Sequence, residues 1–282
     1  MQTVHDAAGL RATIRGWRGQ GQTVGFVPTM GNLHEGHHSL IKLARARAER
    51  VVASVFGNPT QFGPGEDFER YPRTLAQDQA GLAEMDCDLL FAPDVATIYP
   101  FGAAQSVSVH VPGVTDALEG AHRPGHFDGV ATVVCKLFNL VQPDVAVFGQ
   151  KDFQQLKVIE RMVRDLALPV KVLQAPTLRA TDGLALSSRN QYLSEAERAT
   201  APQIHQTLLK MRELLLEKGH ARRVIEQAAA STLERAGFQP DYTVIRRAED
   251  LAEPADEERT GLVALVAARL GRTRLIDNLP FD

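Results

Sequence analysis

Thr23-Val-Gly-Phe-Val-Pro-Thr-Met-Gly-Asn-Leu-His-Glu-Gly-His-His38 is the stretch that decides the fold. Its first residues, Thr23–Val27, are mostly apolar and include β-branched side chains, which is typical of a buried strand. Pro28–Asn32 is rich in turn residues, and a helical pattern begins near Gly36 and runs to about Arg50. The stretch therefore predicts a strand, a turn and a helix, which is the first half of a parallel βαβ unit.

Strands and helices alternate along the following residues. Buried strands are expected at 51–56, 88–91 and 144–148, and helices at 74–84, 129–141 and 153–166. Because helices separate the strands, right-handed crossovers and a Rossmann-like parallel sheet are predicted for an N-terminal domain, residues 1–176. Ligands of such sheets bind beyond the carboxyl ends of the strands, so the loops after Val27, Phe56 and Phe148 should share one crevice.

The pattern changes after about Pro176. Helical stretches are expected at 194–217 and 221–236, and strands at 241–246, 262–267 and 273–277. An acidic connection, 247–259, is interpreted as a solvated surface segment. A smaller α+β domain with an antiparallel sheet, residues 177–282, is therefore predicted.

Composition excludes several classes of protein. The 282 residues are 44% hydrophobic and 23% charged, which rules out an intrinsically disordered chain. The 31 Lys and Arg residues against 34 Asp and Glu give a net charge of -3, so no overall field attracts nucleic acid. Cys87 and Cys135 show no C-x-x-C spacing, which indicates a reduced compartment and no disulfide framework, and no signal peptide or spanning helix is apparent. A cytoplasmic protein that binds neither nucleic acid nor membrane is expected.

The three histidines of the opening stretch admit two chemical interpretations. In the first, His34-x-Gly36-His37 forms a phosphate-binding turn, because the N–H groups at a helix start are unpaired and carry the positive end of the dipole. In the second, His34-Glu35-x-x-His38 is a zinc hydrolase motif. Glycines place His34 at the entry turn and no third ligand follows, which favours phosphate. A turn that the histidines merely cap is the remaining alternative.

Two further polar segments fit phosphate chemistry. Gly149-Gln-Lys-Asp152 directly follows a predicted strand and precedes a helix, and Leu186-Ser-Ser-Arg-Asn190 offers two hydroxyls and a guanidinium. Each segment alone is an ordinary surface loop. The sequence has no Walker A motif, and no G-x-G-x-x-G follows a strand, so the usual nucleotide cradles are absent.

Together, H-x-G-H and S-S-R resemble the two signatures of the HIGH-motif nucleotidyltransferase superfamily, which attacks the α-phosphate of a nucleotide. Seven motifs in register then resemble the pantothenate synthetase family, the AMP-forming pantoate:β-alanine ligases, over essentially the whole chain. They are V-P-T-M-G-N-L-H-E-G-H, N-P-x-Q-F (58–62), Y-P-R-T (71–74), R-P-G-H-F (123–127), K-D-F-Q-Q-L (151–156), D-G-L-A-L-S-S-R-N (182–190) and R-L-I-D-N (274–278).

The resemblance implies condensation of (R)-pantoate with β-alanine, using ATP and Mg²⁺, through an enzyme-bound pantoyl adenylate that releases pyrophosphate and then AMP. It also implies a homodimer formed through the N-terminal domain. The implied catalytic residues are His37, His34, Lys151 and Arg189, and no residue is assigned to a metal. Gln61 is implied for pantoate and β-alanine, and Gln155 for pantoate. The implied ATP-binding residues are Met30, Gly31, Asn32, Leu33, His34, Glu35, Gly36, His37, Gly149, Gln150, Lys151, Asp152, Leu178, Leu186, Ser187, Ser188 and Arg189.

Three positions depart from the pattern common in the family: Gln150 replaces a Glu, Gly57 a Val and Asp128 an Arg. None of them removes an implied catalytic residue. Two other functions stay open at this stage. Another nucleotidyltransferase of the superfamily would retain nucleotide on its product, and a nucleotide-sensing module would catalyse nothing.

Overall fold

The computed structural model describes residues 1–282 except 64–65, 67, 70, 217–219 and 282. The chain folds into two compact units. The first unit comprises Met1–Gly149 with Gln154–Ala175, and the second comprises Gln150–Phe153 with Pro176–Asp282. Each unit has its own sheet and its own hydrophobic core, as a domain requires.

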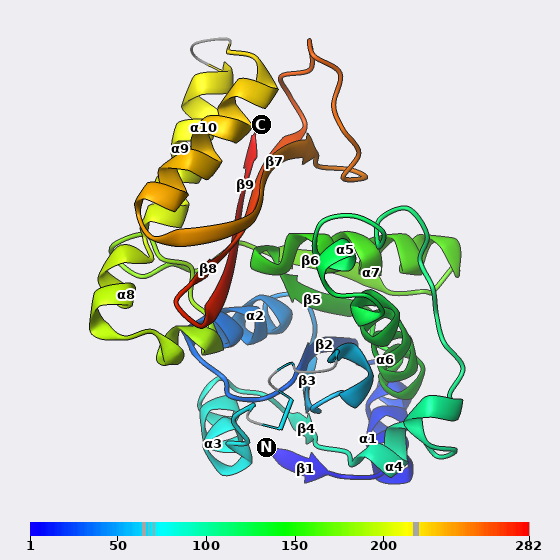
Figure 1. Ribbon diagram of the computed structural model, residues 1–282. Helices are drawn as coiled ribbons and strands as arrows, with labels where there is room; N and C mark the ends of the chain where they lie inside the picture. The colour runs from blue at the N-terminus through cyan, green and yellow to red at the C-terminus, as the bar shows by residue number, and fades with distance from the viewer. Residues whose placement is uncertain (64–65, 67, 70, 217–219, 282) are drawn as a thin grey trace. The chain divides into compact units, whose positions relative to one another are not determined.

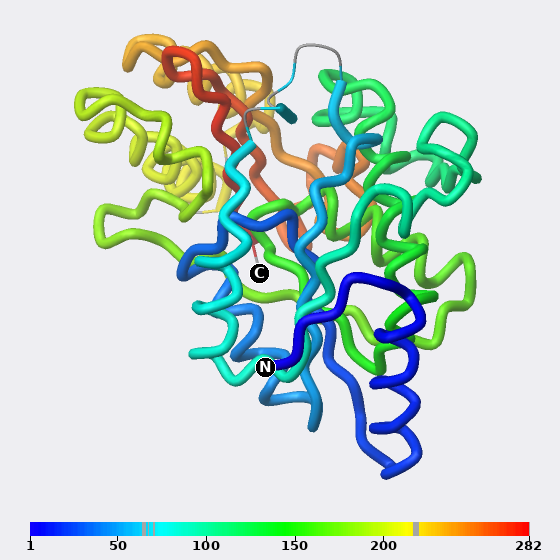
Figure 2. Tube along the Cα trace, turned by 90° about the horizontal axis from the view of Figure 1, so that it is seen from below, coloured from blue at the N-terminus to red at the C-terminus, as the bar shows by residue number. Residues whose placement is uncertain are grey.

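A six-stranded parallel sheet with the order β1-β4-β3-β2-β5-β6 forms the centre of the first unit. β1 pairs with β4 at one edge, next to the N-terminus (Figure 1, Figure 2). This sheet confirms the predicted Rossmann-like fold class. The strands are β1 Gln2–Val4, β2 Val24–Thr29, β3 Arg50–Val55, β4 Leu89–Phe91, β5 Val145–Gly149 and β6 Lys171–Ala175.

Helices of the first unit connect these strands. The longer ones are α1 Ala7–Gly19, α2 Glu35–Arg45, α3 Leu75–Glu84, α6 His126–Val141 and α7 Phe153–Asp165, whose first residue groups with the second unit. The short ones are η1 Pro59–Gln61, α4 Val95–Ile98, η2 Ala103–Gln105 and α5 Glu119–His122. None of the helices that the structure describes combines the length and apolar character needed to cross a bilayer.

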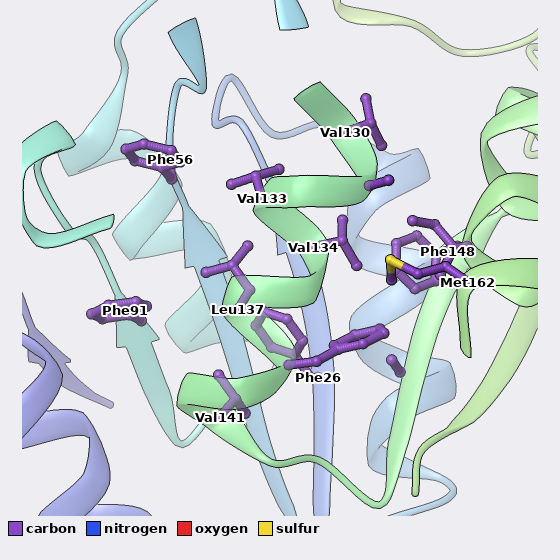
Figure 3. Packing of buried hydrophobic residues seen from close by; sticks show 14 of the residues in the cluster. Phe26, Phe56, Phe91, Val130, Val133, Val134, Leu137, Val141, Phe148 and Met162 are labelled. Atoms are coloured by element: carbon purple, nitrogen blue, oxygen red, sulfur yellow. The ribbon is translucent and has the colours of Figure 1, made fainter. Parts of the chain in front are cut away.

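The hydrophobic core of the first unit lies on both faces of its sheet, because successive side chains along a strand point to opposite faces. Phe26 of β2 packs with residues of α1, α6 and α7 on one face, where Leu137 lies along α6 (Figure 3). Val27, the next residue, packs on the other face with Ile41 of α2 and Leu82 of α3. Full burial of each such side chain contributes about 1.5–3 kcal/mol. The core on this second face therefore holds α2 against the sheet.

The second unit is the smaller α+β structure with an antiparallel sheet that the sequence predicts. Its strands, in the order β7-β8-β9, are β7 Phe238–Arg247, β8 Leu262–Leu270 and β9 Thr273–Phe281. Apolar side chains of two long helices pack on the sheet. The helices of this unit are η3 Gln150–Asp152, η4 Ser188–Tyr192, α8 Glu195–Thr200, α9 Gln203–Leu216 and α10 Arg222–Arg235.

Several predicted boundaries are wrong. The helix expected to reach Arg50 ends at Arg45, because residues 46–49 form the turn that leads into β3, to which Arg50 already belongs. The stretch expected as one helix at 194–217 is α8 and α9, which Pro202 separates because it lacks the N–H that would continue α8; Glu217 lies outside the described residues. β7 begins earlier than expected, at Phe238, and accommodates Pro240 next to a register shift.

Candidate active site

The predicted phosphate turn lies between β2 and α2. Gly31 and Asn32 both have a positive φ, of 88° and 53°, so the chain reverses sharply after the strand. A Cβ at Gly31 would lie 3.0 Å from Oδ2 of Asp78 and 3.1 Å from Cγ1 of Val55, so this position is suited to glycine in both conformation and space. His34 is the N-cap of α2, with an extended backbone.

The two imidazoles at the start of α2 have a defined tautomer. Nδ1 of His34 accepts a hydrogen bond from the N–H of Gly36 (3.1 Å), and Nδ1 of His37 accepts one from the N–H of His34 (3.3 Å). The two ring centroids are 4.2 Å apart. Since each Nδ1 accepts, each neutral ring carries its proton on Nε2. The turn therefore supplies two neighbouring N–H donors beside the positive end of the α2 dipole.

Asp78 of α3 holds this turn by hydrogen bonds. Asp78 was not identified from the sequence as part of the site. The side chain is 2% exposed, and its carboxylate accepts hydrogen bonds from the N–H groups of Asn32 (3.0 Å) and Leu33 (2.8 Å). Its position, four residues before the buried Leu82, places a carboxylate on the buried side of α3. That placement is the signal that could have identified it.

The zinc hydrolase interpretation finds no support in this geometry. His34 lies outside the helix, so it does not share a helical face with His38. A Cβ at Gly81 of α3 would lie 3.0 Å from Nε2 of His38, so this ring packs against α3. Within the described ranges, no group of three or more His, Cys, Asp and Glu residues could hold a metal ion.

Gln61, the glutamine implied for pantoate, is 8% exposed and has an oriented amide. Nδ2 of Asn58 donates to Oε1 of Gln61 (3.0 Å) and to the carbonyl of Gly129 (3.1 Å). Oδ1 of Asn58 in turn accepts from the Tyr99 hydroxyl (2.7 Å). Nε2 of Gln61 contacts Sδ of Met30 at 3.0 Å, so the structure brings these two predicted site residues together. The positioning role of Tyr99 was not predicted.

The R-P-G-H-F motif holds the main chain of Gln61. Nδ1 of His126 donates to the carbonyl of Gln61 (2.8 Å), while Nε2 accepts from Arg123 (3.0 Å). Arg123 also forms an ion pair with Glu66. Burial, followed by the positive charge of Arg123, lowers the pKa of His126 to about 4. His126 is therefore a neutral clamp on the peptide that carries Gln61.

This neutral histidine predicts a pH dependence of stability. Because the folded-state pKa is about 4 and the ordinary value is 6.5, the unfolded chain binds more protons between these pH values. The free energy of unfolding should therefore fall as the pH drops from about 6.5 to about 4, with about 3 kcal/mol attributable to His126. Urea unfolding across this range measures the fall.

The variant His126→Asn keeps a donor for the Gln61 carbonyl and should flatten the pH dependence. His110→Asn is the control, because Asp128 raises the pKa of the exposed His110, and its removal should not reduce the fall. Equal pH profiles for wild type and His126→Asn would contradict the assignment.

The second unit brings two of the predicted ATP segments together. The N–H of Leu186 donates to the carbonyl of Leu178 (2.9 Å), beside a β-bridge between Arg179 and Ala185. Ser187 is the N-cap of η4, which begins at Ser188, and its Oγ accepts from the N–H of Arg189 at 3.3 Å. Leu178 and the Ser-Ser-Arg segment are thus neighbours in one local structure.

The remaining segment, Gly149–Asp152, links the two units. Gly149 is the last residue of β5, and the turn η3 follows, with Lys151 partly buried and Asp152 exposed. The carbonyls of Gln150 and Lys151 both accept hydrogen bonds from Nδ2 of Asn278, at 2.9 Å each. The turn is therefore anchored within the second unit.

Gln154 and Gln155, at the start of α7, differ in their hydrogen-bond partners. Gln154 is 4% exposed; its Oε1 accepts from the N–H of Glu119 (3.0 Å), and its Nε2 donates to the carbonyls of Val114 and Ala117. Gln155, the residue implied for pantoate, is partly buried. Gln154 is thus committed to the fold, which leaves Gln155 as the ligand-binding candidate of the pair.

Comparisons with known proteins agree over the whole length. The family model described as pantoate-beta-alanine ligase matches residues 2–280. A curated pantothenate synthetase of Xanthomonas axonopodis pv. citri (strain 306) is 57% identical, with all of both chains covered. A solved pantothenate synthetase of Thermus thermophilus has a TM-score of 0.92 and 50% identity, covering 99% of each chain. A pantoate-beta-alanine ligase of Francisella tularensis, complexed with beta-gamma ATP and beta-alanine, has a TM-score of 0.81 and 34% identity, covering 99% of this chain and 97% of that one.

Proposed function

This chain belongs to the pantoate-beta-alanine ligase family, and from that membership we propose how its own residues carry out the reaction. Its relatives over the full length are pantothenate synthetases, so the activity is ATP-dependent formation of pantothenate from pantoate and β-alanine. The observation that carries the residue assignment is the pair of imidazoles at the start of α2 whose Nδ1 atoms accept backbone N–H bonds, which leaves Nε2 of each ring as the donor.

The proposed reaction has two steps. The pantoate carboxylate attacks the α-phosphorus of ATP, an oxygen–phosphorus bond forms, and pyrophosphate leaves. The β-alanine amine then attacks the acyl carbon of the pantoyl adenylate, forms the amide bond, loses a proton and expels AMP. In the first step, negative charge accumulates on the oxygens of the α-phosphate and on the departing pyrophosphate.

Four side chains are assigned to this charge. His34 and His37 supply N–H donors next to the N-terminus of α2, and Lys151 and Arg189 supply positive charge from the second unit. Donors aimed at developing charge stabilise the transition state more than the ground state, which is what raises the rate. The other ATP-binding residues implied by the sequence are proposed to surround these four.

Gln61 and Gln155 are proposed to hold pantoate, and Gln61 also to serve the β-alanine end. A neutral amide orients a carboxylate without a strong ion pair, so the carboxylate stays nucleophilic. The network around Gln61 supports this role. Oε1 accepts from Asn58, whereas Nε2 contacts Sδ of Met30, which is a weak acceptor, and a substrate oxygen is a better one.

Other sequence-based expectations remain part of the proposal. Mg²⁺ would arrive on the ATP phosphates and screen their charge, which fits an ion that takes few protein ligands. Residues 1–176 are proposed as the nucleotide- and pantoate-binding domain and 177–282 as a lid that excludes water from the adenylate. Assembly as a homodimer through the N-terminal domain and a cytoplasmic location stay predictions.

An omission experiment tests the route. The protein is incubated with ATP, Mg²⁺, pantoate and β-alanine, and each component is left out in turn. Pyrophosphate should form without β-alanine but never without pantoate, and AMP should appear only with all four. A nucleotide retained on the product would indicate another nucleotidyltransferase, and no pyrophosphate under any condition would indicate a nucleotide-sensing module.

A further inference from the structure

The terminal motif R-L-I-D-N, residues 274–278, has no role in the mechanism so far. It lies on β9, where Asn278 pairs with Leu265 of β8 and Asp277 with Val266. Both polar side chains are buried, with Asp277 5% and Asn278 2% exposed. Burying two polar groups in a small domain is costly unless they are hydrogen-bonded, so their partners indicate what the motif does.

Asn278 holds the turn that carries Lys151. The two N–H bonds of its amide are directed at consecutive carbonyls, those of Gln150 and Lys151, each at 2.9 Å. These carbonyls belong to the two peptide units on either side of the Lys151 Cα, and each peptide unit is planar. Fixing both planes fixes the backbone dihedrals of Lys151. If the Asn278 amide were flipped, Oδ1 would face both carbonyl oxygens and repel them, so only the orientation with Nδ2 toward the carbonyls forms these hydrogen bonds.

Asp277 holds the residues that precede the Ser187–Arg189 segment, which is the other predicted ATP segment of the second unit. Its carboxylate forms a two-pronged ion pair with Arg179, with N–O distances of 2.5 and 2.9 Å. Arg179 also donates to the carbonyl of Gly183 (3.1 Å) and bridges to Ala185, directly before Leu186. A buried, bidentate Arg–carboxylate pair is geometrically specific. Asp277 therefore fixes Arg179 in the β-bridge that shortly precedes Ser187–Arg189.

We propose that Asp277 and Asn278 are positioning residues for ATP, which hold the Lys151 turn and the Ser187–Arg189 segment from one point on β9. The inference rests on the proposed roles of Lys151 and Arg189. A lysine ammonium sits on a flexible four-carbon stem, so fixing its backbone narrows the volume that the charge explores. Precise placement matters because a displacement of about 1 Å at a catalytic group costs about 100-fold in rate.

The variant Asn278→Ala tests the anchor. Hydrogen exchange of the backbone amides at 150–153 should become faster, and kcat/KM for ATP in pyrophosphate release should fall about 10- to 100-fold. Asn278→Asp keeps the shape and replaces the donors with a carboxylate, so it gives the same test if the alanine variant is unstable. Lys151→Ala, measured alongside, checks the proposed role of the lysine itself.

Thr243→Val is the matched control. Thr243 is 7% exposed, and its Oγ1 donates to the carbonyl of Glu226 (2.8 Å), so this variant also removes a buried bond from a side chain to the main chain of the second unit. It should lower the Tm without changing exchange at 150–153 or kcat/KM for ATP.

The outcomes separate the two proposals. Unchanged exchange at 150–153 in folded Asn278 variants overturns the anchor. If exchange at 150–153 is faster but kcat/KM for ATP stays at the wild-type value, Asn278 holds the turn without contributing to the positioning of ATP, and that part of the proposal is overturned. Full activity of Lys151→Ala instead overturns the proposed function of the lysine, while the exchange result still decides whether Asn278 holds the turn.

Discussion

His37→Ala should lower the rate of pantoate-dependent pyrophosphate release by at least about 100- to 1,000-fold, because it removes one of the donors that we propose to face the developing phosphate charge. It also removes the Nδ1 acceptor that His37 provides for the N–H of His34, 3.3 Å away. That second loss loosens the neighbouring imidazole, so the expected effect is larger than for a single donor. Steady-state release with saturating ATP and pantoate measures it.

Two variants make the His37 experiment decisive. His37→Gln keeps an N–H donor at a comparable reach and should recover part of the lost rate. His38→Gln changes the next residue of α2, whose ring packs against Gly81, and should affect stability more than rate. A fully active His37→Ala variant would remove the central assignment of this site.

Gly129→Ala should impair the use of pantoate, because the added methyl group would displace the main chain that carries Gln61. A Cβ on Gly129 would lie 2.4 Å from the Thr60 carbonyl oxygen, 2.6 Å from its carbon and 2.7 Å from the Gln61 nitrogen. All three are main-chain atoms, so α6 and η1 must separate, and Gln61 moves with η1. Overpacking of this kind costs about 1–3 kcal/mol in stability. A shift of Gln61 by about 1 Å should lower kcat/KM for pantoate about 100-fold.

Gly16→Ala provides the control for this substitution. Gly16 lies inside α1, and a Cβ there meets nothing within 4 Å. The change should raise the free energy of unfolding by about 0.5–1 kcal/mol through helix propensity and leave the kinetics unchanged. Unaltered kcat/KM for pantoate in a folded Gly129→Ala variant would show that close packing of α6 does not position Gln61.

Elements buried on both sides could be predicted from sequence. β2, β3 and β5 are mostly apolar runs, which is how central parallel strands appear. β6 could not be predicted in this way, because Lys171 and Gln174 are exposed and the run has no continuous apolar character. α1 is also absent from the sequence-based prediction; it contains Gly9 and Gly16, and internal glycines weaken a helical pattern.

Some residues of the candidate site could also be predicted from the sequence, and others could not. Residues in short motifs, such as His34 and His37, could be named because their chemistry and spacing are local. Their supports are distant in sequence: Asp78 binds the N–H of Asn32 across 46 residues, and Tyr99 binds Asn58 across 41. Such contacts are decided by how the elements pack, and a single sequence does not display that packing.

The order of strands in the first sheet also affects the chain while it is being synthesised. β2 acquires its second neighbour only with β5, and the bond from the N–H of Val24 to Asp144 spans 120 residues. At about 5–20 residues per second, a ribosome needs roughly 6–24 s to make that interval. For that time the strand leading into the histidine turn is open along one side, so the nascent polypeptide passes through a stage in which chaperones have an exposed strand to bind.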